Sequence, residues 1–359
     1  MHLLLFFVLI ILSFLEYVFR KTEFKRFIFI IVIIIFFLNQ CFIYWTPDYY
    51  SYVLHYENIE DYYVYSRLEL FHLYFIKLSH SIKISFEEFY FYYNLLILIF
   101  LIFFIYKITP LPTMVLSIFF LIPYYPDIVQ IRNFLAISLF LVAFLYYKKN
   151  IFKFLFFLLF SIICHYSIVL LLPFFIITRF KFFKNFKFVY ILIVVLILIM
   201  GLIPKNIILP IIGMINNKYE VYLENDRSYL GTLVLSFPFF VLNTIVIYHY
   251  NKYKINFSDN LTKKIEFIIP LVLYANVLII FQYFIRDIIR LTMNLTIFSY
   301  IYFSLIIYYN HKKNILNHII RCLIILWSLI TFYVYFLMIN DGEYYEIIEK
   351  VFESNFLLK

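Results

Sequence analysis

The stretch that decides the fold covers residues 124–178 and reads YYPDIVQIRNFLAISLFLVAFLYYKKNIFKFLFFLLFSIICHYSIVLLLPFFIIT. It places one histidine, His165, between two apolar segments. Four polar residues lie at the N-terminal end of another apolar segment: Asp127, Gln130, Arg132 and Asn133. An arginine at a membrane boundary is costly to move inward, so its position usually has a reason. Two interpretations stay open for Arg132: a site for an anionic headgroup, or an arginine that only extends to the membrane surface.

The composition is typical of membrane proteins. Of the 359 residues, 65% are hydrophobic and only 14% are charged, whereas a soluble domain is about 25% charged. Uncharged stretches such as 27–44 and 188–204 approach the ~20 residues with which a helix crosses a bilayer. We therefore expect an all-α, polytopic integral membrane protein.

The charge and the cysteines exclude other classes. The net charge of +9 comes from basic residues in short loops, which is a topology signal and does not indicate nucleic acid. The three cysteines form no CxxC motif and predict no disulfide framework. No Walker loop, GxGxxG, GxSxG or HExxH motif occurs, and no histidine spacing suggests a metal site. We expect neither a metal nor a cofactor.

The apolar run 154–177 is long enough for one membrane span, but both of its flanks are basic. Lys148, Lys149 and Lys153 precede it, and Arg179 begins a second basic group after it. Because basic loops favour the cytoplasm, both flanks are expected on the same side. We therefore predict two short helices that bend near His165, an arrangement that is tolerated where it lines a cavity.

With this hairpin, the sequence predicts about twelve membrane passes, with both termini outside. The expected spans are 2–19, 27–45, 89–106, 111–123, 133–147, the two halves of 154–177, 188–204, 229–249, 265–281, 291–309 and 315–338. They form one helical domain over 1–340. External loops are expected at 46–88, which carries an amphipathic surface helix, and at 205–228. The tail 341–359 is expected to be an amphipathic external helix.

Charged residues are expected to gather on the outer face. Arg286 and Arg290 are four residues apart, so a helix would place them on one face. Together with Arg132 they could grip a diphosphate without a metal. The alternative is that Asp287 and Arg290 form an ordinary surface ion pair.

Asp48 follows Thr46-Pro47 and heads a run that contains Tyr49 and Tyr52. A carboxylate here could accept the proton of an attacking sugar hydroxyl, with tyrosine rings stacked on the sugar. The alternative is a Pro-Asp turn with interfacial tyrosines. Both interpretations stay open.

Four short motifs occur in order over roughly residues 40–310. They are Asp48-Tyr-x-x-Tyr52, Glu69-Leu-Phe71, Ile131-Arg132-Asn133-Phe-Leu-Ala136 and His165-Tyr-Ser167. In this pattern the chain resembles the EpsG-type branch of bacterial polysaccharide polymerases, which are related in role to the Wzy O-antigen polymerases. That family commonly shows Ile-Arg-Gln-x-x-Ala and Phe-His-x-Ser; this chain has Asn133 in place of the Gln and Cys164 in place of the Phe.

The resemblance implies a GT-C-like glycosyltransferase in the bacterial inner membrane, with its active site facing the periplasm or exterior. It would polymerise undecaprenyl-diphosphate-linked repeat units of O-antigen, capsule or exopolysaccharide and release undecaprenyl diphosphate. Its partners would be the bilayer, a flippase and a chain-length regulator. The implied catalytic residues are Asp48, Arg132 and His165. The implied substrate-binding residues are Tyr49, Tyr52, Glu69, Gln130, Asn133, Arg286 and Arg290.

Two alternatives remain. The first is an O-antigen ligase or another glycosyltransferase that uses a polyprenyl-phosphate donor. The second is a flippase or transporter of lipid-linked oligosaccharides. Transporters often show internal repeats and Gly- or Pro-interrupted helices, whereas this chain has only four glycines and no visible repeat. The transporter is therefore disfavoured. The charged residues do not separate the polymerase from the first alternative, and the family resemblance favours the polymerase.

The hairpin predicts the location of two loops. Reporter fusions at about residues 150 and 183 should both report the cytoplasm, because both positions lie in basic flanks of the run 154–177. Opposite signals from the two fusions would contradict the hairpin and invert every later segment.

Overall fold

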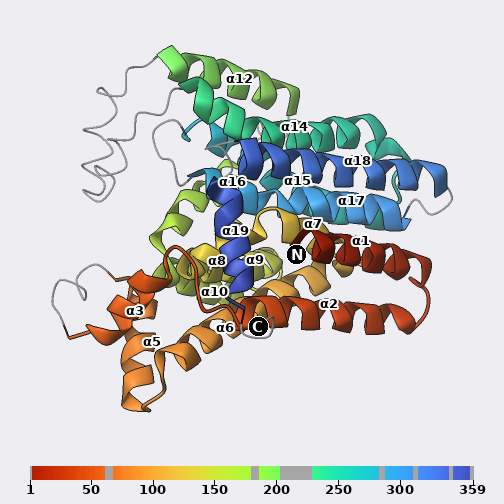
Figure 1. The fold of residues 1–359 in the computed structure, drawn as a ribbon. Helices are drawn as coiled ribbons and strands as arrows, with labels where there is room; N and C mark the ends of the chain where they lie inside the picture. The colour runs from red at the N-terminus through yellow and green to blue at the C-terminus, as the bar shows by residue number, and fades with distance from the viewer. Residues whose placement is uncertain are drawn as a thin grey trace. The chain divides into compact units, whose positions relative to one another are not determined.

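The computed structural model describes residues 2–60, 68–178, 186–202, 229–282, 288–309, 314–338 and 343–355. Within these ranges the chain is helical, and the only pairing of extended backbone is an isolated bridge between Ile43 and Asn355 (Figure 1). Five helices are long and apolar enough to cross a membrane: Phe24–Cys41, Phe86–Ile108, Leu233–Tyr253, Ile288–Tyr309 and His318–Leu337. Shorter apolar helices accompany them. The all-α membrane class is confirmed, and the count of about twelve passes stays a prediction.

The chain divides into two compact units. Unit 1 comprises Met1–Leu172 and Ile324–Lys359, and unit 2 comprises Pro173–Leu323. The expected single domain over 1–340 stays a prediction. The helices of unit 1 are α1 (His2–Val18), α2 (Phe24–Cys41), α3 (Tyr49–Glu57), α5 (Leu70–Ser81), α6 (Phe86–Ile108), α7 (Pro112–Leu121), α8 (Tyr124–Val129), α9 (Ile131–Tyr146), α10 (Ile151–Cys164), the 3-10 helix η1 (Tyr166–Leu171), the end of α18 (Asn314–Phe332), the π-helical turn η5 (Tyr333–Met338) and α19 (Glu343–Glu353).

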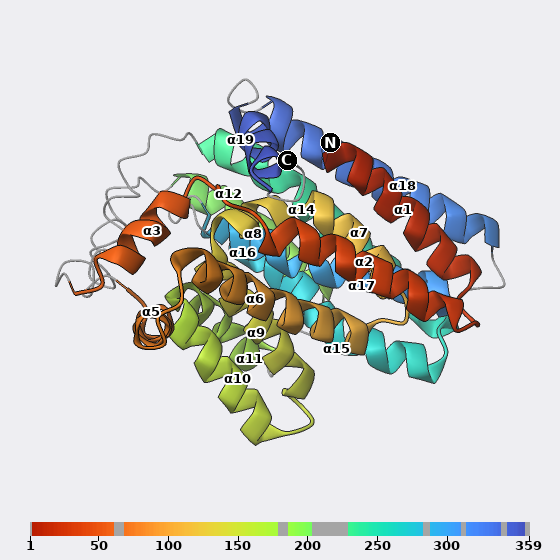
Figure 2. The same ribbon diagram turned by 60° about the horizontal axis from the view of Figure 1, so that its bottom comes forward.

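Helix α9 is the centre of unit 1. Nearly all of its residues are buried, and it packs against α6 on one side and α10 on another (Figure 2). Ser161 of α10 donates a hydrogen bond of 2.6 Å to the backbone oxygen of Ala136 and so fixes the two helices against each other. A helix that is apolar on every side is typical of a buried position. Arg132, its second residue, is therefore held at the start of a helix that is buried along nearly its whole length.

The predicted break near His165 is confirmed. Helix α10 begins at Asn150, whose side chain accepts a hydrogen bond of 3.0 Å from the backbone of Lys153, and it ends at Cys164. His165 adopts an extended backbone, after which the chain continues as the 3-10 helix η1. The apolar run is thus two short helices instead of one span. The side of the membrane on which each flank lies stays a prediction.

The connection 46–88 contains a helix, α5, where the amphipathic surface helix is expected and, in addition, the unexpected helix α3. The external and amphipathic character of this segment stays a prediction. A capping box at Ser85, in which the side chains of Ser85 and Glu88 each accept a hydrogen bond from the other's backbone, begins α6. The expected loop 205–228 lies outside the described residues.

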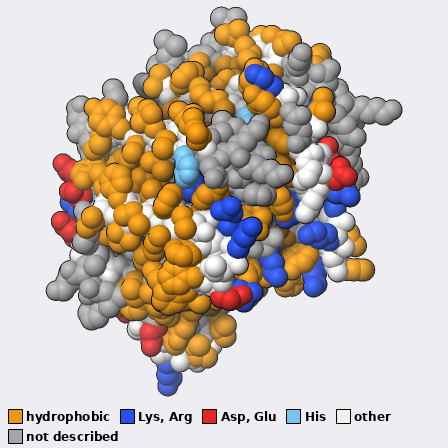
Figure 3. Space-filling view, turned by 90° about the vertical axis from the view of Figure 1, so that its right-hand side faces the viewer, with side chains coloured by type: hydrophobic (Ala, Val, Ile, Leu, Met, Phe, Trp, Pro, Cys, Tyr) orange, Lys and Arg blue, Asp and Glu red, His pale blue; other side chains and the backbone are white. Residues whose placement is uncertain are grey.

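A buried carboxylate joins α1 to α7. Glu16, which is fully buried, accepts hydrogen bonds from the backbone N–H groups of Thr113 and Met114, at 3.2 and 3.3 Å. Pro112 opens α7 without an N–H of its own, so Glu16 satisfies the next two donors of this helix end. The α1–α2 turn and the start of α2 carry the exposed side chains of Lys21 and Arg26, and Figure 3 draws the side of the molecule on which this turn lies, with Lys and Arg in blue.

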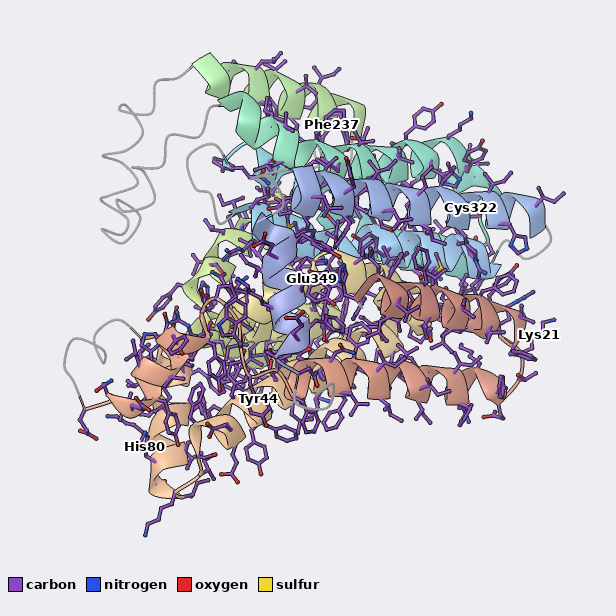
Figure 4. The ribbon with its side chains drawn as sticks, viewed as in Figure 1. Lys21, Tyr44, His80, Phe237, Cys322 and Glu349 are labelled. Atoms are coloured by element: carbon purple, nitrogen blue, oxygen red, sulfur yellow. The ribbon has the colours of Figure 1, made fainter. Side chains whose placement is uncertain are left out.

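Within the tail, Glu343–Glu353 form the helix α19; the expected external position of the tail stays a prediction. The apolar side of α19 packs on the first turn of α1, where the buried ring of His2 lies 5.4 Å from Tyr345 and 6.1 Å from Phe352. Beyond the helix, Asn355 donates a hydrogen bond of 2.8 Å to the backbone oxygen of Leu38 at the end of α2. Glu349 lies on the exposed side of α19 (Figure 4). The tail therefore ties the C-terminal region to the segment that leads into Asp48.

Unit 2 consists of α11 (Pro173–Ile177), α12 (Phe186–Leu202), α14 (Tyr229–Tyr253), the 3-10 helix η4 (Lys254–Asn256), α15 (Asp259–Ile279), α16 (Ile288–Leu295), α17 (Ile297–Tyr309) and the start of α18. Buried amides connect these helices. Asn243 of α14 donates to Asn276 of α15 at 3.0 Å and accepts from Ser299 of α17 at 2.7 Å. Such bonds hold helices together inside a membrane, where no hydrophobic effect operates between them.

Candidate functional site

Three side chains from separate parts of unit 1 meet at one end of α9. The carboxylate of Glu69 accepts a hydrogen bond from Nη1 of Arg132 through its Oε2 atom. Its Oε1 atom lies 3.7 Å from Nε2 of His165. The side chains of Arg132, Glu69 and His165 are 23%, 11% and 28% exposed. We call these three residues the charged cluster.

The local backbone explains why Glu69 faces the cluster. Glu69 is the residue before the first turn of α5, with an extended backbone (φ −68°, ψ 147°). A side chain at this position usually accepts a hydrogen bond from its own helix, but the carboxylate of Glu69 accepts none from α5. It is directed to Arg132 and His165 instead. The ion pair therefore holds the start of α5 against the start of α9.

His165 is oriented by Ser167 and Asn133. The backbone N–H of Ser167 donates to Nδ1 of His165 at 3.2 Å. An acceptor role for Nδ1 places the proton of the neutral ring on Nε2, the atom that faces Glu69. The hydroxyl of Ser167 has two acceptors within reach, Nδ1 at 2.8 Å and Oδ1 of Asn133 at 2.9 Å. Asn133 thus supports His165 from the residue next to Arg132.

A layer of aromatic and histidine rings lies beside the cluster. The guanidinium of Arg132 is 5.8 Å from the ring centre of Tyr52, which lies 5.7 Å from that of His72. His72 is fully buried, and its ring is 6.0 Å from His55 and 5.6 Å from Tyr93. We call the rings of Tyr52, His55, His72 and Tyr93 the floor of the site.

Burial sets the charges of this floor. Burial, with a contribution from Arg132, lowers the pKa of His55 to about 4 and holds the pKa of His72 well below its ordinary value. Burial also raises the pKa of the Tyr52 hydroxyl to about 12, against the opposing effect of Arg132. All three rings are therefore neutral near pH 7, and the floor contributes no charge that would compete with Arg132.

The structure brings together five of the expected site residues: Arg132, His165, Glu69, Asn133 and Tyr52. Asp48 precedes the first turn of α3, one helical turn before Tyr52, and is half-buried. Tyr49 packs edge-to-face on Phe86 and Tyr90, at 5.2 Å from each.

The other expected residues lie elsewhere. Gln130 connects α8 to α9, and its backbone oxygen accepts a hydrogen bond of 3.0 Å from the N–H of Phe134. Asp127 is buried in α8. Arg290 belongs to α16 in unit 2. Arg286 lies outside the described residues, so the expected grip of three arginines stays a prediction.

Sequence reasoning missed several residues of the site. Ser167 was visible only as the last letter of the His-x-Ser motif, and its role in orienting His165 follows from the structure. His55, His72 and Tyr93 gave no usable signal, because their rings meet across α3, α5 and α6. Within the described ranges, no three His, Cys, Asp or Glu side chains gather to hold a metal ion.

These features define a class: a helical membrane protein with a cation, a carboxylate and a histidine joined where membrane helices end or begin. The model of the EpsG family matches residues 25–348, a range that includes the whole charged cluster, and the chain belongs to this family. Family membership makes it a membrane protein of polysaccharide biosynthesis. No curated protein and no solved structure matches the chain.

The charged cluster predicts a strong energetic coupling between Glu69 and Arg132. Glu69→Ala leaves the half-buried guanidinium without its carboxylate and should lower the free energy of unfolding by about 2–3 kcal/mol, less than for a fully buried pair. Removing both partners in Glu69→Ala/Arg132→Ala should restore part of this loss. The coupling is measured as a double-mutant cycle by titration of mixed micelles with a denaturing detergent.

The exposed pair Arg26–Glu23 is the matched control, because its side chains are bonded at 2.6 Å but are 72% and 80% exposed. Its coupling should stay below about 1 kcal/mol. Equal coupling energies for the two pairs would contradict the view that the cluster is a partly desolvated site.

Proposed function

We propose that this protein is a polysaccharide repeat-unit polymerase of the bacterial inner membrane, acting on undecaprenyl-diphosphate-linked oligosaccharides at the external face. The observation that carries the proposal is the charged cluster, in which a half-buried guanidinium meets a carboxylate and an oriented histidine. Family membership supports the polysaccharide part of the proposal. No nucleotide is available outside the cytoplasm, so a lipid-borne diphosphate is the expected leaving group.

Arg132 is the residue proposed to bind the diphosphate. A guanidinium carries five N–H donors in a planar fork that fits phosphate oxygens, and the bond at Nη1 to Glu69 uses one of them. Partial burial strengthens the remaining interactions, since fewer waters compete for them.

His165 is proposed to contact the leaving group. Ser167 and Asn133 fix its ring so that Nε2 carries the proton, and this N–H can donate to a phosphate oxygen as negative charge develops there. Glu69 is proposed as a positioning residue that holds both the guanidinium and the imidazole. Its negative charge is balanced by Arg132 before substrate arrives.

The reaction then has a balanced form. The hydroxyl oxygen at the non-reducing end of one repeat unit bonds to the anomeric carbon of the growing chain. The bond between that carbon and the phosphate oxygen breaks, and its electron pair leaves with undecaprenyl diphosphate. The hydroxyl proton passes to Asp48, which lies one turn from Tyr52 on α3.

Substitutions of the cluster test this proposal. Arg132→Lys should lower polymer synthesis about 10- to 100-fold, because a lysine lacks the planar fork and a hydrogen bond to a charged group contributes about 1.5–3 kcal/mol. Arg132→Ala should lose more, and His165→Ala and Asp48→Asn should be comparably inactive. Polymer length and amount are measured in cells that lack the chromosomal gene, at equal membrane abundance.

Arg26→Lys is the control, since this arginine is exposed and should tolerate lysine. Near-normal polymer in Arg132→Lys would reject the clamp at this position. Deletion of the gene separates the alternatives: a missing polymerase leaves single repeat units attached to the final acceptor. A missing ligase leaves long chains on the lipid carrier, and a missing flippase leaves the units inside.

A further inference from the structure

A stripe of exposed apolar side chains on α10 leads to the charged cluster. Phe156, Leu159 and Ile163 recur at helical spacing and are 63%, 58% and 38% exposed. Tyr166, which is 51% exposed, extends the stripe and directly follows His165. One face of α10 is therefore an uninterrupted apolar track that ends beside the histidine of the cluster.

A second exposed apolar stripe begins at the other side of the cluster. Leu70 directly follows Glu69, and Leu70, Tyr74 and Leu78 are spaced by four residues along α5. Helices α5 and α10 contact each other through the rings of Phe71 and Phe160, which are 5.1 Å apart. The cluster therefore opens onto apolar surface at both α5 and α10.

Charge and apolar surface together point to one kind of ligand. The cluster offers a half-buried guanidinium for an anionic group, and the adjacent stripe offers a track for a long hydrocarbon chain. A free phosphate would use only the guanidinium. A ligand that uses both features has an anionic head and an extended apolar tail.

We propose that the α10 stripe is the seat of the polyprenyl chain of the lipid diphosphate. The diphosphate lies at Arg132, and the first isoprene units run from Tyr166 along Ile163, Leu159 and Phe156. This inference rests on the proposed function. It adds the route of the carrier, which enters and leaves the site from the lipid that faces α10, next to His165.

The stripe determines where the polyprenyl chain lies but adds little to the affinity for the carrier. A polyprenyl tail exchanges contacts with lipid for contacts with protein of similar polarity, so little hydrophobic free energy is gained. Affinity comes from the headgroup at Arg132. The location of the chain is therefore tested by proximity.

Helix α2 offers a matched control for such a measurement. Its exposed stripe of Phe27, Ile30 and Ile34 has the same spacing and similar exposure, 54%, 51% and 48%. This stripe also begins beside an arginine, Arg26, but that side chain is 72% exposed and paired with Glu23. Any general attraction of anionic lipids to basic residues would act on both stripes.

The experiment places the photoreactive residue p-benzoylphenylalanine at position 159 or, in a separate protein, at position 30. Membranes that contain either protein are irradiated with radiolabelled undecaprenyl diphosphate. Labelling at position 159 should be about tenfold stronger than at position 30, the scale of one hydrogen bond to a charged group. Arg132→Ala should reduce it to the level of position 30. If the variants at positions 159 and 30 do not insert into the membrane, the same comparison is made at positions 156 and 27.

Competition identifies the source of the signal. Excess unlabelled undecaprenyl diphosphate should abolish the labelling, whereas undecaprenol, which lacks the anionic head, should have little effect. Inorganic pyrophosphate in excess should lower the labelling, because it would occupy Arg132. Equal labelling of α10 and α2, or labelling unchanged in Arg132→Ala, would overturn the inference. Polymer synthesis in the same membranes separates the two proposals: activity without preferential labelling overturns only the α10 track, and preferential labelling without polymer overturns only the polymerase.

Discussion

The carboxylate of Glu69 lies between the guanidinium of Arg132 and the imidazole of His165, and it ties together three segments that the chain keeps far apart. Each of these groups is partly withdrawn from water, where an isolated charge is unfavourable. The arrangement is stable only while the partners stay together. The start of α5, the start of α9 and the end of α10 are therefore held at one point.

The local sequence supplies what this contact needs. The chain leaves helical geometry at His165, so the imidazole lies at a helix end instead of within an apolar wall. Ser167 then turns the ring, and Asn133 receives the hydroxyl of Ser167 from the side of α9. Burial of α9 among α6 and α10 keeps Arg132 from moving to a more exposed position. The site is a consequence of where helices stop, a common solution for polar chemistry at membrane depth.

Apolar periodicity and charge were sufficient to predict several of the helices, but not how they meet. The break at His165, the helix at 70–81 and the tail helix followed from helical spacing and basic flanks, and the structure contains all three. Helix α3 was not predicted, because its tyrosine-rich sequence is equally typical of an interfacial loop. Glu69 was expected only to bind substrate. No local pattern could show that it bridges Arg132 and His165, since its partners lie 63 and more residues away. For the same reason the His55–His72 contact was not foreseen.

Arg132 is proposed to contact the phosphate of the lipid carrier, and this contact can be measured as nuclear proximity. Protein labelled with ¹⁵N at arginine is reconstituted with undecaprenyl diphosphate, and dipolar coupling between ³¹P and guanidinium ¹⁵N is recorded in the solid state. Contact at Arg132 should give clear dephasing of the diphosphate signal in the wild type and a marked reduction in Arg132→Lys at saturating lipid. Dephasing that is absent from the wild type, or unchanged by Arg132→Lys, would contradict it.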